Sequence, residues 1–104
     1  MTAKTRRERT RWHILQMLQA ARPVGINESC LRRILTHLDV KYSVAELRSE
    51  IDYFRERELI AIDERDADNW GLMLKSAGIM VAEWSVPPPA GINRPSIRQW
   101  RRGR

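Results

Sequence analysis

Residues 43–74, SVAELRSEIDYFRERELIAIDERDADNWGLML, change from a helical to an alternating hydrophobic period within one short stretch. Ser43 and Glu46 have the Ser-x-x-Glu spacing of a capping box, which predicts that a helix begins here. From Leu59 onward, apolar residues alternate on either side of the acidic turn 66–69, and this pattern predicts a β-hairpin. Apolar residues at helical spacing form the buried stripe of the predicted helix: Val44, Leu47, Ile51 and Phe54.

Two more helices are expected before this stretch and one after it. Residues 5–21 carry an apolar face, and Pro23 ends the helix because the residue before a proline disfavours the helical conformation. Asn27 is a good N-cap for a second helix that ends near Leu38, and Ser76 is expected to cap a short closing helix. The predicted fold is therefore mainly α with a small β-hairpin, an α+β domain with a three-helix core.

The chain divides by charge into three parts. Residues 1–11 hold five basic and one acidic residue, and residues 85–104 hold five basic and none acidic, whereas residues 12–84 hold nine basic and twelve acidic. The net charge of +6 therefore comes from the two ends and indicates a polyanionic partner. We predict a basic arm over residues 1–5, a folded domain over 6–84, and a proline-rich spacer with a basic, flexible tail over 85–104.

Cysteine usage and hydropathy restrict the class of protein. Cys30 is the only cysteine, so an intramolecular disulfide or a cysteine-based zinc site is excluded, and a reduced cytoplasmic setting fits. No apolar run has the length of a signal peptide or approaches the roughly 18 residues of a membrane span. We expect a soluble, unprocessed, cytoplasmic protein without a membrane partner.

Five segments share a pattern of apolar residues and helix caps: ILQML at 14–18, NES at 27–29, ELI at 58–60, WGLML at 70–74 and GINRP at 91–95. With three helices, a two-stranded wing and a closing helix, they resemble the winged helix-turn-helix family, and within it small proteins encoded by Mu-like prophages. The resemblance covers residues 6–95 and implies DNA association. Relatives often have glycine before the wing strand, where this chain has Glu58. A non-glycine residue would be strained there, which predicts a different helix end.

The resemblance implies that the third helix enters the major groove. Arg48 and Arg55 lie two turns apart on that helix, and arginine suits the O6 and N7 atoms of guanine. The alternative is that Arg48 pairs with Asp52, and Arg55 with Glu56 or Glu58, on a solvated surface. Further candidate DNA contacts on the third helix and the turn before it are Lys41, Tyr42, Ser49 and Tyr53.

The tail is a second candidate nucleic-acid element. Its arginines are interleaved with Trp100, which can stack on a base or pack on its own domain. The alternative is a disordered basic end that keeps the protein soluble. The wing is a poor candidate because its tip holds four acidic residues and only one basic residue, Arg65. The candidate DNA contacts in the tail are Arg94, Arg98, Trp100, Arg101 and Arg102.

Enzymatic chemistry is not expected. His13 and His37 have no metal-ligand spacing, no glycine-rich phosphate loop is present, and Cys30 fits a packing role better than that of a nucleophile. The acidic turn lacks the oxygen ligand and the bidentate glutamate of a calcium loop. We therefore expect a non-enzyme without metal or cofactor.

Two functions fit these patterns. The first is a small prophage-type DNA-associated protein in transcriptional regulation or phage DNA handling. The second is a protein-protein interaction module, for example in phage packaging or assembly, whose acidic third helix and wing dock a basic partner. A homodimer is a further expectation, paired through Trp12 and Met17 of the first helix.

Overall fold

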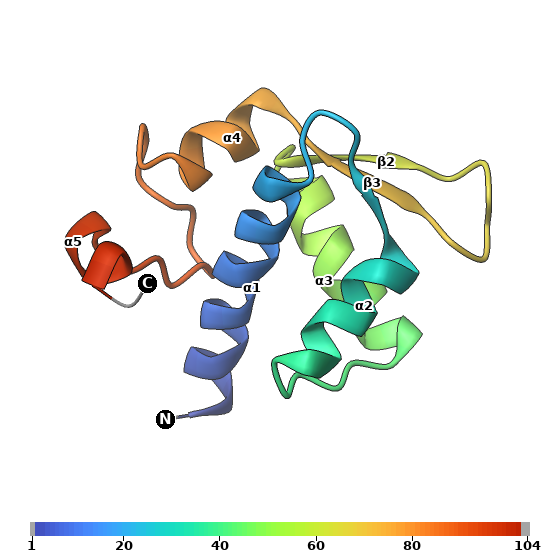
Figure 1. Cartoon of the computed structure of the whole chain (residues 1–104), viewed down its shortest axis with the longest axis horizontal. Coiled ribbons are helices and arrows are strands. Elements are labelled where there is room, and N and C mark those ends of the chain that lie inside the picture. Colours follow the sequence, from blue (N-terminus) through green and yellow to red (C-terminus); the bar gives the residue numbers. More distant parts are fainter. Residues whose placement is uncertain (1, 103–104) are drawn as a thin grey trace.

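The computed structural model describes residues 2–102, which form a small α+β domain with five helices and a three-stranded antiparallel sheet (Figure 1). The sheet has the order β1-β3-β2, so β3 lies in its centre, with Leu72 opposite Ile26 on one side and Ile62 on the other. The predicted α+β fold with a small hairpin is confirmed. Along the chain the elements are α1 (Ala3–Ala20), β1 (Ile26–Asn27), α2 (Glu28–His37), α3 (Val44–Glu56), β2 (Ile60–Asp63), β3 (Gly71–Leu74), α4 (Ser76–Ala82) and α5 (Ile97–Arg102).

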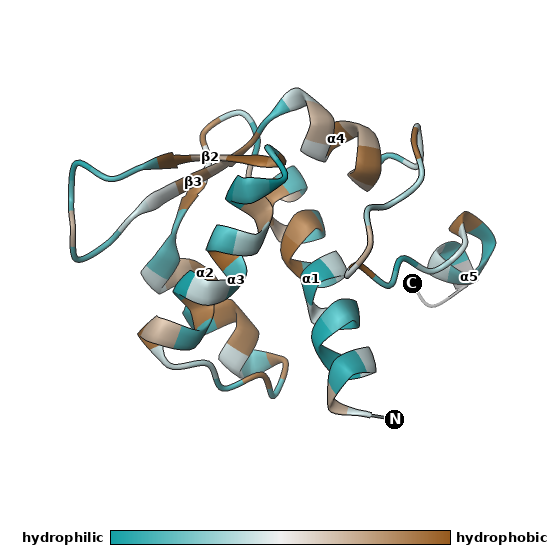
Figure 2. Ribbon diagram, turned by 180° about the vertical axis from the view of Figure 1, so that it is seen from behind, coloured by the Kyte–Doolittle hydropathy of each residue, from teal (hydrophilic) through white to brown (hydrophobic). Residues whose placement is uncertain are grey.

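The core lies between α1, α2, α3 and one face of the sheet. In both ribbon views α1 passes between α5 on one side and the α2 and α3 pair on the other (Figures 1 and 2). Figure 2 shows hydrophilic colour over the N-terminal half of α1 and over the β2–β3 turn, so the apolar packing is concentrated between these two regions. Each buried aliphatic or aromatic side chain contributes about 1.5–3 kcal/mol relative to exposure. The largest fully buried side chains are Trp12, Phe54, Ile14, Leu15, Leu18, Leu31, Leu35, Leu47 and Ile51.

Two of the predicted helix starts are confirmed. Ser43 and Glu46 form the full capping box of α3, and the side chain of Asn27 accepts a hydrogen bond from the backbone N–H of Cys30 at 2.9 Å. The prediction for α4 was wrong by one residue, because Lys75 is the N-cap and provides no side-chain hydrogen bond. Helix α1 begins at Ala3 rather than near residue 5, so most of the expected basic arm is helical.

The C-terminal segment packs against the domain, which corrects the expectation that residues 85–104 lie outside the core. Ile92 is buried within the hydrophobic core. The backbone N–H of Asn93 donates to the carbonyl of Glu8 in α1 at 3.1 Å, and Trp84 Nε1 donates to the carbonyl of Pro95 at 3.0 Å. The segment therefore returns along α1 before it forms α5.

Helix α3 ends with Glu58 in the left-handed conformation, at φ 58°. The N–H of Glu58 donates to the carbonyl of Arg55 at 2.9 Å, and the N–H of Leu59 donates to that of Phe54 at 3.0 Å. This hydrogen-bond pair is the Schellman motif, which usually has glycine at the position of Glu58. The expectation of a different helix end was therefore wrong, and the strained residue is tolerated. Asp39 after α2 and Trp84 after α4 have the same conformation, at φ 63° and 60°.

Replacing Glu58 with glycine should stabilise the protein. Glycine adopts positive φ without a Cβ clash, and the gain exceeds its extra unfolded-chain entropy, so we expect the free energy of unfolding to rise by roughly 0.5–1 kcal/mol. Chemical denaturation monitored by circular dichroism measures the change. Glu58→Gln keeps the strain while removing the charge and should be close to neutral. An equal gain in both variants would show that charge, not backbone conformation, limits stability here.

Candidate nucleic-acid interface

Arg48 of α3 is bound by a buried carboxylate. Its Nε and Nη2 atoms donate to the two carboxylate oxygens of Glu28 at 3.0 and 2.5 Å, and Glu28 is only 4% exposed. Glu28 Oε1 also accepts the backbone N–H of Trp70 at 3.0 Å, so one carboxylate joins α2, α3 and the start of β3. This bidentate geometry uses the donors that would otherwise contact a guanine.

The remaining surface of Arg48 is also occupied. Its guanidinium lies 4.0 Å from the centre of the Trp70 ring, and Nη2 donates to the carbonyl of Ala67 at 2.7 Å. Hydrogen bonds from Arg48 hold the pKa of Glu28 below its ordinary value, and burial opposes that shift. The expected pairing of Arg48 with Asp52 was wrong, because the partner is twenty residues away in the sequence.

Arg55 and the wing form a second internally paired group. Arg55 contacts Asp52 at 2.5 Å and Glu64 at 2.7 Å, which corrects the expectation that it pairs with Glu56 or Glu58. At the β2–β3 turn, Arg65 donates to Asp63, and these hydrogen bonds lower the pKa of Asp63 to about 2. The arginines of this surface are therefore paired, and its other acidic side chains leave it negative.

Tyr53 holds the C-terminal segment rather than facing a groove. Its ring lies between two guanidinium groups, with Arg11 3.8 Å and Arg57 3.7 Å from the ring centre. The hydroxyl donates to the carbonyl of Ala90 at 2.5 Å, and Arg11 Nη1 donates to that of Gly91 at 3.0 Å. Tyr53 is half-buried, so its predicted DNA contact would compete with a structural role.

Two predicted tail contacts also hold the fold together. Arg94 donates to the carbonyls of Val81 and Val86 at 3.0 and 2.7 Å. Trp100 packs edge-on against Trp12 with ring centres 5.6 Å apart, and it lies 6.0 Å from the ring of His13. Burial of His13, followed by the nearby Arg9 charge, lowers the pKa of His13 and favours its neutral form.

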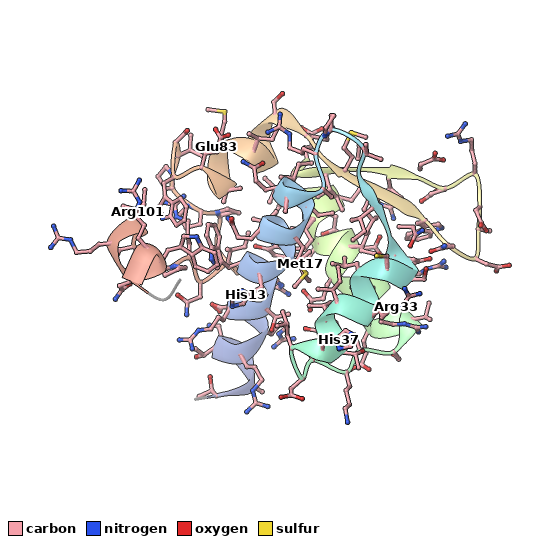
Figure 3. All side chains as sticks on the ribbon, in the orientation of Figure 1. His13, Met17, Arg33, His37, Glu83 and Arg101 are labelled. Atoms are coloured by element: carbon pink, nitrogen blue, oxygen red, sulfur yellow. The ribbon has the colours of Figure 1, made fainter. Side chains whose placement is uncertain are left out.

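This packing brings the two basic ends of the chain onto one face of the molecule. Helix α1 lies in the middle of that face, with α5 on one side and the α2–α3 turn on the other (Figure 1). Figure 3 shows His13 on α1 between Arg101 on α5 and His37 on α2. Six exposed cations that form no ion pair within residues 2–102 make up what we call the basic face: Arg6, Arg7, Arg9, Lys41, Arg98 and Arg101.

The basic face contains some predicted residues and adds others. Lys41, Arg98 and Arg101 were predicted, whereas the α1 arginines were recognised only as an arm charge. Tyr42 and Ser49 line a hollow beside α1, described below. Arg102 lies in α5, but its side chain and Arg104 lie outside the described residues. The sequence does contain a pattern that places α1 arginines together, because Arg6 and Arg9 are three residues apart and share a helix face.

Two further expectations concern ligands and pairing. Within residues 2–102, no group of three side chains could hold a metal ion, and none of the helices is both long and apolar enough to cross a membrane. Trp12 is fully buried within the domain, so its side chain is not available for the expected dimer contact, and the homodimer itself stays a prediction.

Acid should destabilise the protein partly through Glu28. Because its pKa is lowered on folding, the unfolded state binds more protons, and its stabilisation is complete above about pH 4.5 and lost as the pH falls through the folded-state pKa. We expect the melting temperature of the wild type to fall more between about pH 6 and pH 3 than that of Glu28→Gln. Glu56→Gln removes an exposed α3 carboxylate that forms no ion pair with the described residues, and this variant should behave as the wild type. Parallel curves for wild type and Glu28→Gln would contradict this role.

Comparison of the chain with protein-family models, curated proteins and solved structures gives no match. The function is therefore inferred from the side chains that the fold brings together. The decisive contrast lies between the internally paired arginines of α3 and the wing and the unpaired cations of the basic face.

Proposed function

We propose that this chain is a winged-helix protein that associates with DNA through the phosphates, using the basic face instead of α3. The order of three helices, a hairpin and a closing helix, with a short strand between the first two helices, supports the winged-helix assignment. One observation carries the proposal: both basic ends of the chain meet on one face, where Arg6, Arg7, Arg9, Arg98 and Arg101 form no ion pair within residues 2–102, whereas Arg11 is paired with Glu50.

The electrostatics of α3 argue against base reading by this helix. Arg48 would have to leave a buried carboxylate to reach a base edge, and Arg55 would have to leave two carboxylates. Breaking these ion pairs costs free energy, and contacts with the base edges would have to offset that cost. DNA approached by α3 would also meet the acidic tip of the wing, which repels phosphate.

The charge of the basic face fits backbone binding. Contacts from all six cations would give a log-log salt dependence with a slope of about −5. Such binding is strong in dilute salt and carries little sequence information.

This mode favours DNA handling over site-specific transcriptional regulation. A regulator must distinguish its operator through base edges or DNA shape, whereas the basic face offers guanidinium and ammonium groups suited to phosphates. The resemblance to small winged-helix proteins of Mu-like prophages supports a role on phage DNA.

A second candidate function is docking of a basic protein on the surface formed by α3 and the wing. The observation that favours it is the concentration of carboxylates there, several of which have no cationic partner within residues 2–102. Figure 1 places the β2–β3 turn and α5 at opposite ends of the longest axis, so the wing tip is separate from α5. A partner on the wing tip would leave the basic face open.

Removing cations from the basic face should reduce the salt dependence of duplex binding. Arg98→Ala with Arg101→Ala removes two exposed guanidinium groups without touching Trp100, and we expect the slope to become less steep by about 1.8 units. Fluorescence anisotropy with a labelled duplex over a salt series measures it.

The matched control is Arg65→Ala, which removes an arginine that is 91% exposed at the wing tip. We expect this variant to keep the wild-type slope, because phosphate contacts lie at the other end of the molecule. A loss of slope in Arg65→Ala about half as large as in the double variant would mean that only net charge matters. A wild type that does not bind duplex in dilute salt would exclude the proposed function.

A further inference from the structure

A hollow of about 550 Å³ lies on the basic face, between the N-terminal half of α1 and the turn that joins α2 to α3. Its volume is in the range of small-molecule sites, about 300–1,000 Å³. Three of its lining side chains are carboxylates, namely Asp39, Glu46 and Glu50. Three others are members of the basic face, and the hollow therefore adjoins the surface proposed to bind phosphates. Those three are Arg6, Arg7 and Lys41.

The wall opposite α1 presents an aromatic ring and a hydroxyl. Tyr42 is half-buried against the core, and its hydroxyl forms no hydrogen bond with residues 2–102. Burial, followed by the nearby charge of Glu50, raises the pKa of Tyr42, so the phenol stays protonated and able to donate. Ser49 is exposed on α3 and also lines the hollow.

Glu50 gives the hollow a fixed acceptor. The residue is 6% exposed, and its Oε2 atom accepts a hydrogen bond from Arg11 Nε at 2.5 Å. Its other oxygen, Oε1, accepts no hydrogen bond from residues 2–102. This oxygen is open to solvent in the hollow, because Trp12 Nε1 is the only fully buried side-chain nitrogen or oxygen of residues 2–102 that lacks a hydrogen-bond partner. An amino group of a ligand can donate to it.

We propose that this hollow binds one unpaired nucleotide of a DNA strand, with its phosphate on Arg6, Arg7 and Lys41 and its base against Tyr42. The free oxygen of Glu50 then accepts a hydrogen bond from the exocyclic amino group of the base, as carboxylates do from cytosine N4. Cytosine and adenine carry such a group and thymine does not. This inference rests on the proposed DNA association and adds a preference for single-stranded ends next to duplex.

The chemistry of the hollow is the reason for choosing an unpaired nucleotide. Duplex phosphates lie on the outside of a stacked helix and need only surface cations, whereas a ring beside a carboxylate acceptor suits a base that has left the stack. Every base can stack on an aromatic side chain, so stacking does not distinguish one base from another. The exocyclic amino group distinguishes cytosine and adenine from thymine.

The test compares a blunt duplex with the same duplex carrying a three-cytosine or three-thymine overhang. We expect the cytosine overhang to bind the full chain about tenfold more tightly than the blunt duplex, and the thymine overhang to gain less. Ser49→Asp places a negative charge in the hollow and should abolish the preference. Ala45→Asp adds the same charge one turn earlier on α3, outside the lining of the hollow, and should retain it.

A second pair of variants separates loss of the nucleotide site from loss of folding. Tyr42→Phe keeps the ring and should keep most of the overhang preference, whereas Tyr42→Leu removes the stacking surface and should lose it. Melting curves of both variants establish that they are folded.

The outcomes separate this inference from the proposed function. Duplex binding without an overhang preference, or equal loss in Ser49→Asp and Ala45→Asp, would overturn the nucleotide site and leave the basic face intact. Overhang binding that depends on Ser49 and Tyr42 but occurs without any blunt-duplex binding would support the site and remove the proposed duplex function. Absence of binding to every probe would overturn both.

Discussion

The packing of Trp12 against two other tryptophans determines where the basic ends of the chain lie. Trp12 is fully buried, and its ring meets Trp84 and Trp100 edge-on at 4.9 and 5.6 Å between centres. Each such pair adds about 0.5–1.5 kcal/mol beyond the burial of area. The Trp12 Nε1 atom has no hydrogen-bond partner within residues 2–102, a cost that packing has to offset. Docking of α5 and burial of Trp12 are therefore coupled, and the basic face depends on both.

Trp12 packing places unpaired cations on the surface, whereas the Glu28–Arg48 pair, on the other side of the molecule, makes an arginine unavailable to an outside partner. A carboxylate this deeply buried needs a cation and a hydrogen-bond donor, and it obtains both from Arg48 and the backbone of Trp70. Once the arginine is held there, the exposed charged side chains of α3 are Glu46, Glu56 and Arg55, and Arg55 is itself paired with carboxylates. The same contact that joins α2, α3 and the hairpin thus leaves α3 without an arginine that is unpaired within residues 2–102.

The sequence predicted those features that depend on neighbours along the chain. The capping box of Ser43 and Glu46, the Asn27 cap and the alternation around the wing all act within a few residues, and each was correct. The ion pairs failed because helix-surface rules consider partners three or four residues away, whereas Glu28 and Arg48 are separated by twenty residues. Strand β1 has only two residues, too few for a period to be recognised.

The C-terminal segment and the site show a further limit of local patterns. Ile92 and Trp100 both pack against the domain, but they stand among polar and proline residues in the sequence. Composition alone therefore indicated a free tail. Of the candidate site, the sequence supplied the charges and several residues that lie on the basic face, but not the separation of the arginines into paired and unpaired groups. That separation requires the fold, because an arginine is available to a phosphate only where no carboxylate of the same protein reaches it.

The distribution of charge also relates the two candidate functions to each other. The acidic wing and the basic α5 lie at opposite ends of a molecule 39 Å long, several times the screening length of about 8 Å at physiological salt. A phosphate surface therefore attracts one end and repels the other, and bound DNA would leave the wing pointing away from it. A basic protein partner could then occupy the exposed acidic end without displacing the DNA. The two proposed activities, DNA association through the basic face and protein docking at the wing, are therefore compatible in this geometry.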